Sequence, residues 1–600
     1  MLNFIKRCGL LFIYTFAYLE PAFCKSRSVD LERIVITKTN AHPLDVYALE
    51  LDEVGILGSF IESLTALGFL DLQSRNLKAG IQTDFSLRGS NFQGVLILLD
   101  GQRINDPQTA HHNADIPITI EDIERIELIP GAGSSLFGPD AIGGAINLIL
   151  KKPKEKKMTL KTSFGSYQTK SNLFSFTEKK DDLGIRFSLE RTESDGFRYD
   201  TDFREFISRF DSSLGLPDGE FNLGWGYQEK EFGAYNFYTP GLDYPSKEWT
   251  KTFCLNTGLN LNKEGFLIKP NFLWRRHYDK FTLDKRRLDW YLNHHCTDVY
   301  TPTIYMEKET EDLGRWGWGL EYGQERINST KLGKHNRSHR SIFLDHSKDL
   351  DGSIFWGLSF RFDDFDGFAN IYTGLANLRF KPNEFNSLHL GISKSMRVPS
   401  FTELSYNDPT TEGTPGLLPE RSLAYQIGYD YREEKIMLGS TFFLRKEKDF
   451  IDWIKHTPSQ NKWQAENITE AEVFGVETFL NFKINPNLSL ESNYTYIHRH
   501  LASRSYLYKY GPNYIQHLFN TSFNFDFALL KQRVNFHYKK RPHRHGWLLN
   551  NIIFSFNLNK LNKNATVFLK IDNLFNVEYQ DIEGIPQPGR WFETELRFEW

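Results

Sequence analysis

The last ten residues of the chain, WFETELRFEW (591–600), alternate between apolar and charged side chains. Because successive side chains of a β-strand point to opposite faces, this pattern predicts a strand with one apolar and one charged face. Such a strand, ending on an aromatic residue, is suited to closing a membrane barrel with its apolar face toward lipid. The edge strand of a soluble sheet could alternate in the same way, so the decision rests on the rest of the chain. The apolar face carries Phe592, Leu596, Phe598 and Trp600, and the charged face carries Glu593, Glu595, Arg597 and Glu599.

The same period of two runs through residues 153–600, as in LSLESNYTY (488–496) and FSFNLN (554–559). Turn signals separate these segments, and the chain goes out and back once in roughly 30 to 50 residues, whereas a soluble sandwich turns every 8 to 12 residues. Long strands joined alternately by short turns and long loops are typical of an outer-membrane barrel. At roughly 20 residues per strand and turn, this part predicts an all-β membrane barrel of about 22 antiparallel strands. The short turns are expected at Asp351-Gly352, Lys381–Asn383, Tyr431–Lys435, Asn485–Asn487 and Lys560–Asn564.

Residues 41–152 differ from the barrel part and predict a compact α+β domain. Apolar residues recur at helical spacing in LDEVGILGSFIESLTALGFLDL (51–72), and GVLILLDGQRI (94–104) combines a strand with an Asp-Gly hairpin turn. Two further strands are expected in IERIELIP (123–130) and AIGGAINLIL (141–150). Barrels of about 22 strands have a plugged lumen, so we predict that this domain is a plug inside the barrel.

The glycine-rich stretch GAGSSLFGPDAIGGAINLILKK (131–152) looks at first like a phosphate-binding loop. Pro139 and Asp140 stand where a P-loop needs Lys and Ser or Thr, and the dinucleotide motif fails because four residues separate Gly133 from Gly138. The glycines are therefore interpreted as structural, allowing tight turns inside a crowded barrel. Lys151-Lys152 is expected to lead out toward the first barrel strand, and the stretch as a whole is interpreted as the hinge between plug and barrel.

The N-terminus has the features of an export signal. Lys6 and Arg7 precede an apolar core, CGLLFIYTFAYL (8–19), which is short for a membrane span, so residues 1–24 predict a signal peptide. A retained membrane anchor is the alternative. No later window approaches the eighteen or more apolar residues of a spanning helix, which leaves the β-barrel as the means of crossing a membrane. The expected location is the outer membrane, with lipid as a partner.

The chain resembles the TonB-dependent outer-membrane receptors along essentially its whole mature length. The plug carries this resemblance in FSLRGS (85–90), VLILLDGQRIND (95–106) and IERIELIPGAGSSLFGPDAIGGAINLILKK (123–152). The barrel carries it in MRVPSFTELSY (396–406), GTPGLLPERS (413–422), NITEAEVFGVE (467–477), DNLFNVEYQ (572–580) and PGRWF (588–592). The motifs follow one another in the order of the family.

The resemblance places an energy-coupling segment, the TonB box, after the signal peptide. LERIVITKT (31–39) occupies that place, within a periplasmic extension at residues 25–40. A short β-prone run can add as a strand to a partner's sheet edge, and the implied partner is a TonB-like protein of the TonB–ExbB–ExbD complex. A first plug strand packed inside the barrel is the alternative. The box residues are Glu32, Arg33, Ile34, Val35, Ile36 and Thr37.

Members of the family carry scarce metal-containing ligands. The short chain and compact plug are similar to the cobalamin receptors, so cobalamin is the first expected ligand and a ferric siderophore the second. Haem receptors of the family carry a His between two motifs that correspond here to RVPSFTEL (397–404) and GTPGLLPE (413–420). This chain has no His between Arg397 and Glu420, and only Tyr406 could act as an axial ligand there. A passive porin or adhesin is the alternative of a different class. The chain contains none of the hydrolase motifs, so we expect no enzyme.

The candidate ligand site is the polar loop NDPQTAHHNADIP (105–117), which follows the predicted hairpin and should form a plug apex. Its histidines could ligate a metal complex or hydrogen-bond a ligand, although solvated loop histidines are the more ordinary interpretation. By resemblance to the cobalamin receptors, Asp200 and Asp202 are a candidate Ca²⁺ site, and no other cofactor is expected. The candidate ligand-binding residues are Asn105, Asp106, Gln108, His111, His112 and Asn113.

The remaining features leave some alternatives open. Cys254 and Cys296 could form a disulfide in an oxidising compartment or remain free thiols. His294 and His295 beside Cys296 look like metal ligands, but three adjacent residues cannot all converge on one ion. The formal net charge is −4, which gives no electrostatic case for a nucleic-acid partner. We expect the protein to act as a monomer.

Overall fold

The computed structural model describes residues 47–50, 58–131, 133–239, 241–501, 506–527, 529–558 and 564–600. The predicted signal peptide and TonB box lie outside these described residues, as do Val54 and Leu57 of the predicted helix. Within the described ranges, no helix is long and apolar enough to cross a membrane.

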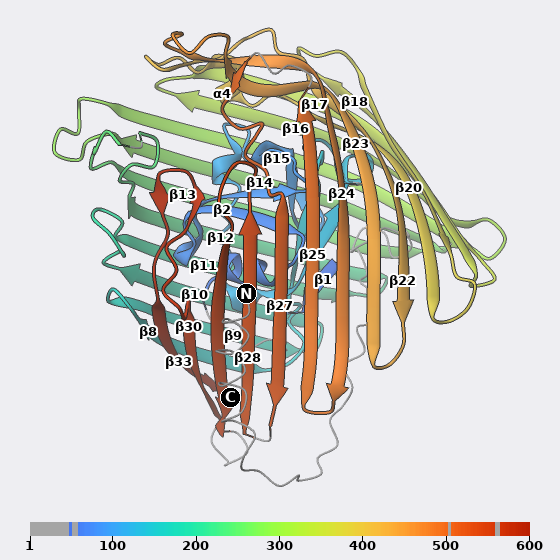
Figure 1. Ribbon diagram of the computed structural model, residues 1–600. Coiled ribbons are helices and arrows are strands. Elements are labelled where there is room, and N and C mark those ends of the chain that lie inside the picture. The colour runs from blue at the N-terminus through green and yellow to red at the C-terminus, as the bar shows by residue number, and fades with distance from the viewer. Residues whose placement is uncertain are drawn as a thin grey trace. The chain divides into compact units, whose positions relative to one another are not determined.

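The larger part of the described chain is a closed barrel of 22 antiparallel strands, as predicted. Each strand pairs with its neighbours in the sequence, and the C-terminal strand closes the sheet against the first (Figure 1). The strands are β8 (Lys157–Gly165), β9 (Thr169–Lys180), β10 (Leu183–Ser194), β11 (Phe203–Leu216), β12 (Gly219–Gly233), β13 (Lys247–Lys263), β14 (Phe266–Thr282), β15 (Leu292–Thr310), β16 (Gly314–Ser329), β17 (Gly333–Leu350), β18 (Ile354–Phe365), β19 (Ile371–Phe380), β20 (Asn386–Arg397), β22 (Glu420–Arg432), β23 (Ile436–Lys455), β24 (Trp463–Asn485), β25 (Leu488–Leu501), β27 (His517–Asp526), β28 (Leu530–Lys540), β29 (Trp547–Asn557), β30 (Ala565–Asp572) and β33 (Trp591–Glu599).

Strand β33 closes the barrel with the two faces that its sequence predicts. It pairs with β30 on one side and β8 on the other, with Phe598 opposite Leu160. The outward side chains of Phe592 and Leu596 are 51% and 38% exposed, whereas Glu593 and Glu595 are each 6% exposed and point inward. The apolar face is therefore available to lipid and the charged face to the plug.

The connections between strands are all short at one end of the barrel, and the long connections lie at the other end. The predicted turns at Asp351-Gly352, Lys381–Asn383, Tyr431–Lys435 and Asn485–Asn487 each join two consecutive strands. The long connections hold the small elements α4 (Phe401–Ser405), β21 (Thr411–Glu412), β26 (Leu507–Tyr508), β31 (Gln580–Ile582) and β32 (Ile585–Pro586). Short turns face the periplasm in barrels of this kind, so the long loops mark the outer end.

The plug contains a five-stranded sheet in the order β1-β6-β7-β4-β5 and a separate hairpin, β2-β3. The predicted Asp-Gly hairpin is confirmed, with Leu99 opposite Gln102. Its strands are β1 (Tyr47–Glu50), β2 (Leu70–Asn76), β3 (Ile81–Leu87), β4 (Val95–Leu99), β5 (Gln102–Arg103), β6 (Ile123–Pro130) and β7 (Gly144–Leu150). Its helical turns are α2 (Phe60–Ser63), η1 (Leu64–Ala66), η2 (Lys78–Gly80), η3 (Phe92–Gly94), η4 (Ala110–His112), η5 (Ile120–Asp122) and α3 (Ser134–Phe137).

The helix predicted in residues 51–72 is shorter in the described part than its periodicity indicates. Ile61 and Leu64 are buried at helical spacing, but α2 and η1 end at Leu67, whose backbone is extended at φ −79° and ψ 105°. Gly68 follows, where a side chain would overlap Asn493 of the barrel wall. The close approach of the wall favours extended chain, and β2 begins at Leu70.

The glycine-rich stretch is structural, as its sequence indicates. Gly144 has φ +138°, and a Cβ there would lie 2.3 Å from the carbonyl oxygen of Ile129. Asp140, the residue that argues against phosphate, instead binds Arg103 at 2.5 Å. The backbone NH of Asp140 donates to Met396 of β20, so this stretch is fastened to the barrel wall. The role of this stretch as a hinge between plug and barrel stays a prediction.

Buried ion pairs join the plug to strands far apart around the barrel. Glu593 of β33 lies 3.2 Å from Lys78, Arg186 of β10 lies 3.1 Å from Asp122, and Glu477 of β24 lies 2.7 Å from Arg88. A domain that contacts such widely separated strands through inward-facing side chains lies inside the lumen. The predicted plug is therefore confirmed. The pair formed by Arg88 contains side chains that are only 2% and 0% exposed.

We expect Arg88→Met to loosen the plug, because it leaves the Glu477 carboxylate buried without the guanidinium that neutralises it. Breaking a buried pair in this way costs about 3–5 kcal/mol, whereas replacing both partners by apolar groups is often neutral. Guanidinium unfolding in detergent should show a lower plug midpoint for R88M and recovery in R88M/E477L. The exposed pair Arg191–Glu193 is the control, since its removal should cost at most about 1 kcal/mol. An unchanged midpoint in R88M would contradict the assignment.

Candidate ligand site

All six candidate ligand-binding residues lie in one plug loop, between β5 and β6, and this loop includes η4. The structure divides them into two sets. Only the His111 side chain is part of the accessible surface, because the other five are buried. The buried set is Asn105, Asp106, Gln108, His112 and Asn113. Their role in ligand binding stays a prediction, and their observed contacts are within the protein.

The two asparagines fix the shape of the loop. Asn105 accepts a hydrogen bond from the NH of Ile97 at 2.7 Å and donates to the carbonyl of Val95 at 3.0 Å. Asn113 accepts from the NH of Asp106 at 2.8 Å. These bonds satisfy buried backbone groups that would otherwise destabilise the fold. The asparagines thus position the loop against β4 and fix the bend between Asp106 and Asn113.

Asp106 joins the loop to the barrel wall. Its carboxylate forms an ion pair with Arg275 of β14 and accepts a hydrogen bond from Thr297 of β15 at 3.0 Å. Burial opposes the charge of Asp106, but Arg275, together with His277 and His112, outweighs burial and lowers its pKa from 3.8 to about 2. The carboxylate is therefore charged at neutral pH and belongs to the seam between plug and barrel.

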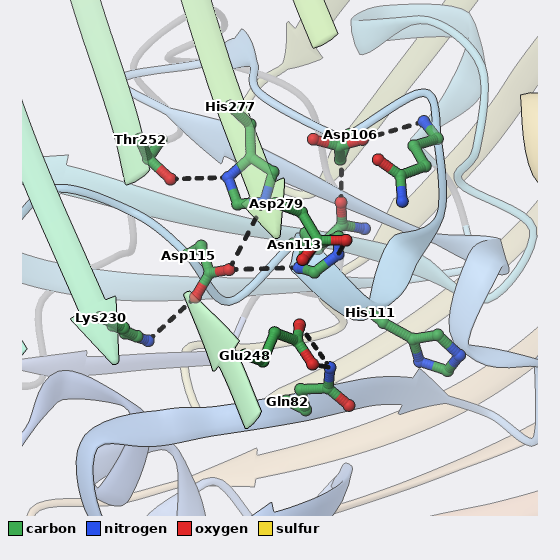
Figure 2. Close-up of polar contacts among 12 residues, drawn as sticks. Gln82, Asp106, His111, Asn113, Asp115, Lys230, Glu248, Thr252, His277 and Asp279 are labelled. Carbon is green, nitrogen blue, oxygen red and sulfur yellow. Dashed lines mark hydrogen bonds and ion pairs between the residues drawn. The ribbon is translucent and has the colours of Figure 1, made fainter. Parts of the chain in front are cut away.

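His112 is buried on the same seam, beside the loop residue Asp115. Its Nδ1 lies 3.3 Å from Asp115 and its Nε2 lies 3.6 Å from Asp279 of β14. Burial acts against a charged imidazole, but the two carboxylates outweigh it and raise the pKa of His112 well above its usual value. Figure 2 shows Asp115 and Asp279 in this region, with Lys230 of β12 bonded to Asp115.

His111 points away from that seam and stacks on Phe92, with ring centroids 4.3 Å apart. Its Nδ1 lies 2.7 Å from Asp84, and burial lowers the pKa of His111, which favours the neutral imidazole. Phe92 in turn meets Tyr510 of the outer loops edge to face at 5.1 Å. These contacts place His111 and Phe92 on the part of the plug that faces the long loops.

We define the apex surface as the half-buried, loop-facing residues of two neighbouring plug loops. None of these side chains carries a fixed charge, and they combine an aromatic ring, an imidazole and neutral hydrogen-bonding groups. The contribution of the β3–β4 loop was missed by the sequence reasoning, although an aromatic residue between two amides after FSLRGS could have indicated it. The apex surface comprises Asn91, Phe92, Gln93, Thr109 and His111.

The outer loops carry further aromatic residues, and one of these loops contacts the candidate ligand loop. Tyr406, the only candidate haem ligand of its segment, lies 3.2 Å from Tyr291, hydroxyl to hydroxyl. Phe401 of α4 donates its backbone NH to Pro107 of the plug loop at 2.9 Å, so this outer loop is docked on the apex. Cations accompany the rings, with Lys331 over Tyr291 at 4.6 Å and Lys509 over Tyr510 at 5.4 Å.

The other candidate sites are less well supported by the geometry. Asp200 is buried and forms an ion pair with Lys285. Among the described residues, the groups that could hold a metal contain neither Asp200 nor Asp202, so calcium stays a prediction. His295 is buried whereas His294 is exposed, so these neighbours diverge. Both described cysteines, Cys254 and Cys296, are free thiols.

The fold and the site define an outer-membrane β-barrel receptor with an internal plug. A family model described as "TonB dependent receptor-like, beta-barrel" matches residues 158–574, and one described as "TonB-dependent Receptor Plug Domain" matches residues 61–145. The chain belongs to the TonB-dependent receptor family. It is accordingly an outer-membrane protein of a family of transporters and receptors, and the resemblance seen in its motifs is confirmed.

Two curated relatives differ in their names. The iron-regulated outer membrane virulence protein of Vibrio cholerae serotype O1 is 24% identical over 592 residues, covering 86% of this chain and 87% of that protein. The vitamin B12 transporter BtuB of Vibrio vulnificus is 24% identical over 414 residues, covering 65% of this chain and 64% of that protein.

Solved structures share the fold. The siderophore receptor PirA from Pseudomonas aeruginosa matches with a TM-score of 0.74 and 16% identity, covering 92% of this chain and 99% of that chain. The ferric enterobactin receptor PfeA matches with a TM-score of 0.75 and 15% identity, covering 92% of this chain and 99% of that chain.

Low pH should weaken the ion pair between Asp106 of the plug and Arg275 of the barrel wall. Because its pKa is lower in the folded protein, its ion pair contributes stability that is complete above about pH 4 and is lost as the pH falls through about 2. The shift corresponds to about 2 kcal/mol. Asp106→Asn should therefore be less stable than wild type at pH 6, with the difference shrinking toward pH 2, measured as unfolding midpoints in detergent. A difference that does not change with pH would contradict this account.

Proposed function

We propose that this receptor imports cobalamin across the outer membrane by TonB-dependent transport. The observation that carries the proposal is the neutral, aromatic character of the apex surface. Cobalamin is a large chelate whose rim is lined by amide groups, and such a ligand is matched by rings and neutral hydrogen-bonding side chains. Asn91, Gln93 and Thr109 supply the hydrogen-bonding groups, and Phe92 and His111 supply the stacked rings. The vitamin B12 transporters among the relatives add support.

A ferric siderophore is the second candidate. The cations that lie over aromatic rings in the outer loops, such as Lys331 over Tyr291, would favour an anionic aromatic chelate. The iron-regulated relative that matches 86% of this chain points the same way. The two candidates differ in the charge that they require of the apex surface, whose five side chains carry no fixed charge. We therefore rank cobalamin above a ferric siderophore as the ligand.

The import cycle follows from the parts of the family architecture. Ligand binds to the apex surface and the outer loops, and the TonB box at residues 32–37 adds as a strand to a TonB-like protein of the TonB–ExbB–ExbD complex. Force from that complex then displaces or partly unfolds the plug. The buried pairs at Arg88 and Asp106 are among the contacts that have to break for the plug to leave the wall. The receptor acts in this cycle as a monomer.

Purified receptor should bind cyanocobalamin, and the apex surface should determine the affinity. We expect Phe92→Ala and His111→Ala each to weaken binding about 10-fold or more, because each removes one partner of the stacked pair, worth on the order of 1–2 kcal/mol. Isothermal titration in detergent measures the change, with His294→Ala as the matched control away from the apex. Tight binding of a ferric siderophore, with no heat from cobalamin at micromolar concentration, would replace cobalamin by the second candidate.

Deleting residues 31–38 should separate binding from transport. Without the strand-forming segment, the TonB-like partner has nothing to pair with, so uptake should fall to background while surface binding stays normal. Cells expressing the deletion variant as their only receptor are tested for growth on limiting cobalamin and for binding of labelled ligand. Uptake that persists in this variant would remove the coupling role from the segment.

A further inference from the structure

A cluster of histidines and carboxylates lies on the seam between the plug and strands β13 and β14. We call it the seam cluster, and its members are His112, Asp115, Glu248, His277 and Asp279. All five side chains are buried. Within two overlapping triplets of the cluster, nitrogen and oxygen atoms lie within 4.8 Å of one another. The triplets are His112–Asp115–His277 and His112–Glu248–Asp279.

In the first triplet, three atoms converge because the opposite atom of each side chain is already engaged. His277 Nδ1 lies 2.8 Å from the Thr252 hydroxyl, Asp115 Oδ1 lies 3.0 Å from Lys230, and His112 Nε2 faces Asp279 at 3.6 Å. Figure 2 shows Thr252 and Lys230 bonded to His277 and Asp115 from outside the cluster. Such outer contacts orient imidazole and carboxylate ligands around protein-bound metals.

The converging atoms are His112 Nδ1, Asp115 Oδ2 and His277 Nε2. Asp115 Oδ2 lies 3.3 Å from the first and 3.9 Å from the last, so the two histidines meet at one carboxylate oxygen. The His277 side chain is 0% exposed, and its Nε2 has no hydrogen-bond partner among the described residues. A buried polar atom without a partner is costly, and here it is aimed at a carboxylate and a second imidazole.

Two carboxylates of the cluster lack a lysine or arginine partner within the described ranges. In the described chain, Lys230 and Arg275 already pair with Asp115 and Asp106. Glu248 accepts hydrogen bonds from Gln82 and Tyr238, both at 2.8 Å, and the ion-pair partners of Asp279 among the described residues are His112 and His295. Two buried carboxylates therefore have no lysine or arginine partner in this part of the structure. A buried carboxylate of this kind has to be neutralised by a proton, by a cationic neighbour such as a protonated His112, or by a metal ion.

We propose that His112, Asp115 and His277 bind a first-row divalent transition-metal ion of the zinc class. Two imidazoles and one carboxylate are donors that suit Zn²⁺ and its neighbours rather than Ca²⁺ or Mg²⁺. Asp279 and Glu248 supply the negative charge around it. The ion is separate from the transported chelate and from the expected calcium at Asp200 and Asp202, and the site stands whichever ligand the apex surface binds.

The bound ion clips the plug to the barrel wall. His112 and Asp115 belong to the plug loop, and His277 belongs to β14, so the ion bridges parts that separate when the plug moves. His112 directly follows His111 of the apex surface. The apex residue His111 and the metal ligand His112 therefore share one turn, η4, so the clip adjoins the apex surface.

The test uses full-length receptor purified in detergent without a polyhistidine tag and stripped with EDTA. Co²⁺ is titrated as a probe by its visible absorption, and Zn²⁺ is added to displace it. We expect one Co²⁺ per chain, displaced by Zn²⁺, with this binding lost in His277→Ala and Asp115→Asn. Thr252→Val should keep the stoichiometry and weaken the affinity about 10–100-fold, because it removes only the contact that orients His277.

His294→Ala is the matched control, since its exposed side chain points away from the cluster. Heat-dependent migration in gels verifies that each barrel is folded, and T252V carries the test should H277A fail to fold. Absence of stoichiometric Co²⁺ or Zn²⁺ binding, or binding that survives unchanged in T252V and D115N, overturns the proposal. In that case His112 carries a proton and joins Asp115 to Asp279 as an ion-pair clip only.

Discussion

The constraint on which the whole structure depends is that no backbone amide may face lipid unpaired. A closed antiparallel sheet meets this constraint because every strand has two neighbours, and the pairing of β33 with β8 removes the last edges. The size of the lumen and the polarity of the inner wall follow from that closure. A sheet of 22 strands encloses a wide lumen, and the inward face of each strand has to be polar enough to bind a domain held there by ion pairs.

The inner wall and the plug are therefore joined differently from a soluble core. The apolar clusters of the plug reach the wall at a few positions such as Leu173 and Leu375, and buried ion pairs join the plug to the wall at several others. Lys78, Arg88 and Asp106 each meet a partner on a different barrel strand. A buried ion pair requires a specific geometry. Removing one partner lowers the free energy of unfolding, whereas the intact pair adds little to it. This combination suits a domain that stays seated at rest and is moved by external force.

Local sequence patterns predict the architecture well. The alternation in WFETELRFEW, the turn at Asp351-Gly352 and the Asp-Gly hairpin after β4 all depend on neighbours in sequence, and each is confirmed. The seam could not be predicted, because its partners lie far apart in the chain, as Arg88 and Glu477 do. His111 and His112 show what local sequence patterns do not predict. His111 and His112 look equivalent in a polar loop, yet one faces the apex and the other is buried against β14.

The order of the plug sheet has a mechanical consequence. Strand β1 is an edge strand of four residues, paired only with β6, and it is the first described strand of the plug. Strand β7 lies at the centre of the sheet and is followed directly by barrel strand β8. A pull from the N-terminal side therefore loads the short outer strand first, while the central strand is anchored covalently to the wall. Under such a pull, the few hydrogen bonds between β1 and β6 are therefore strained before the contacts of the central strand.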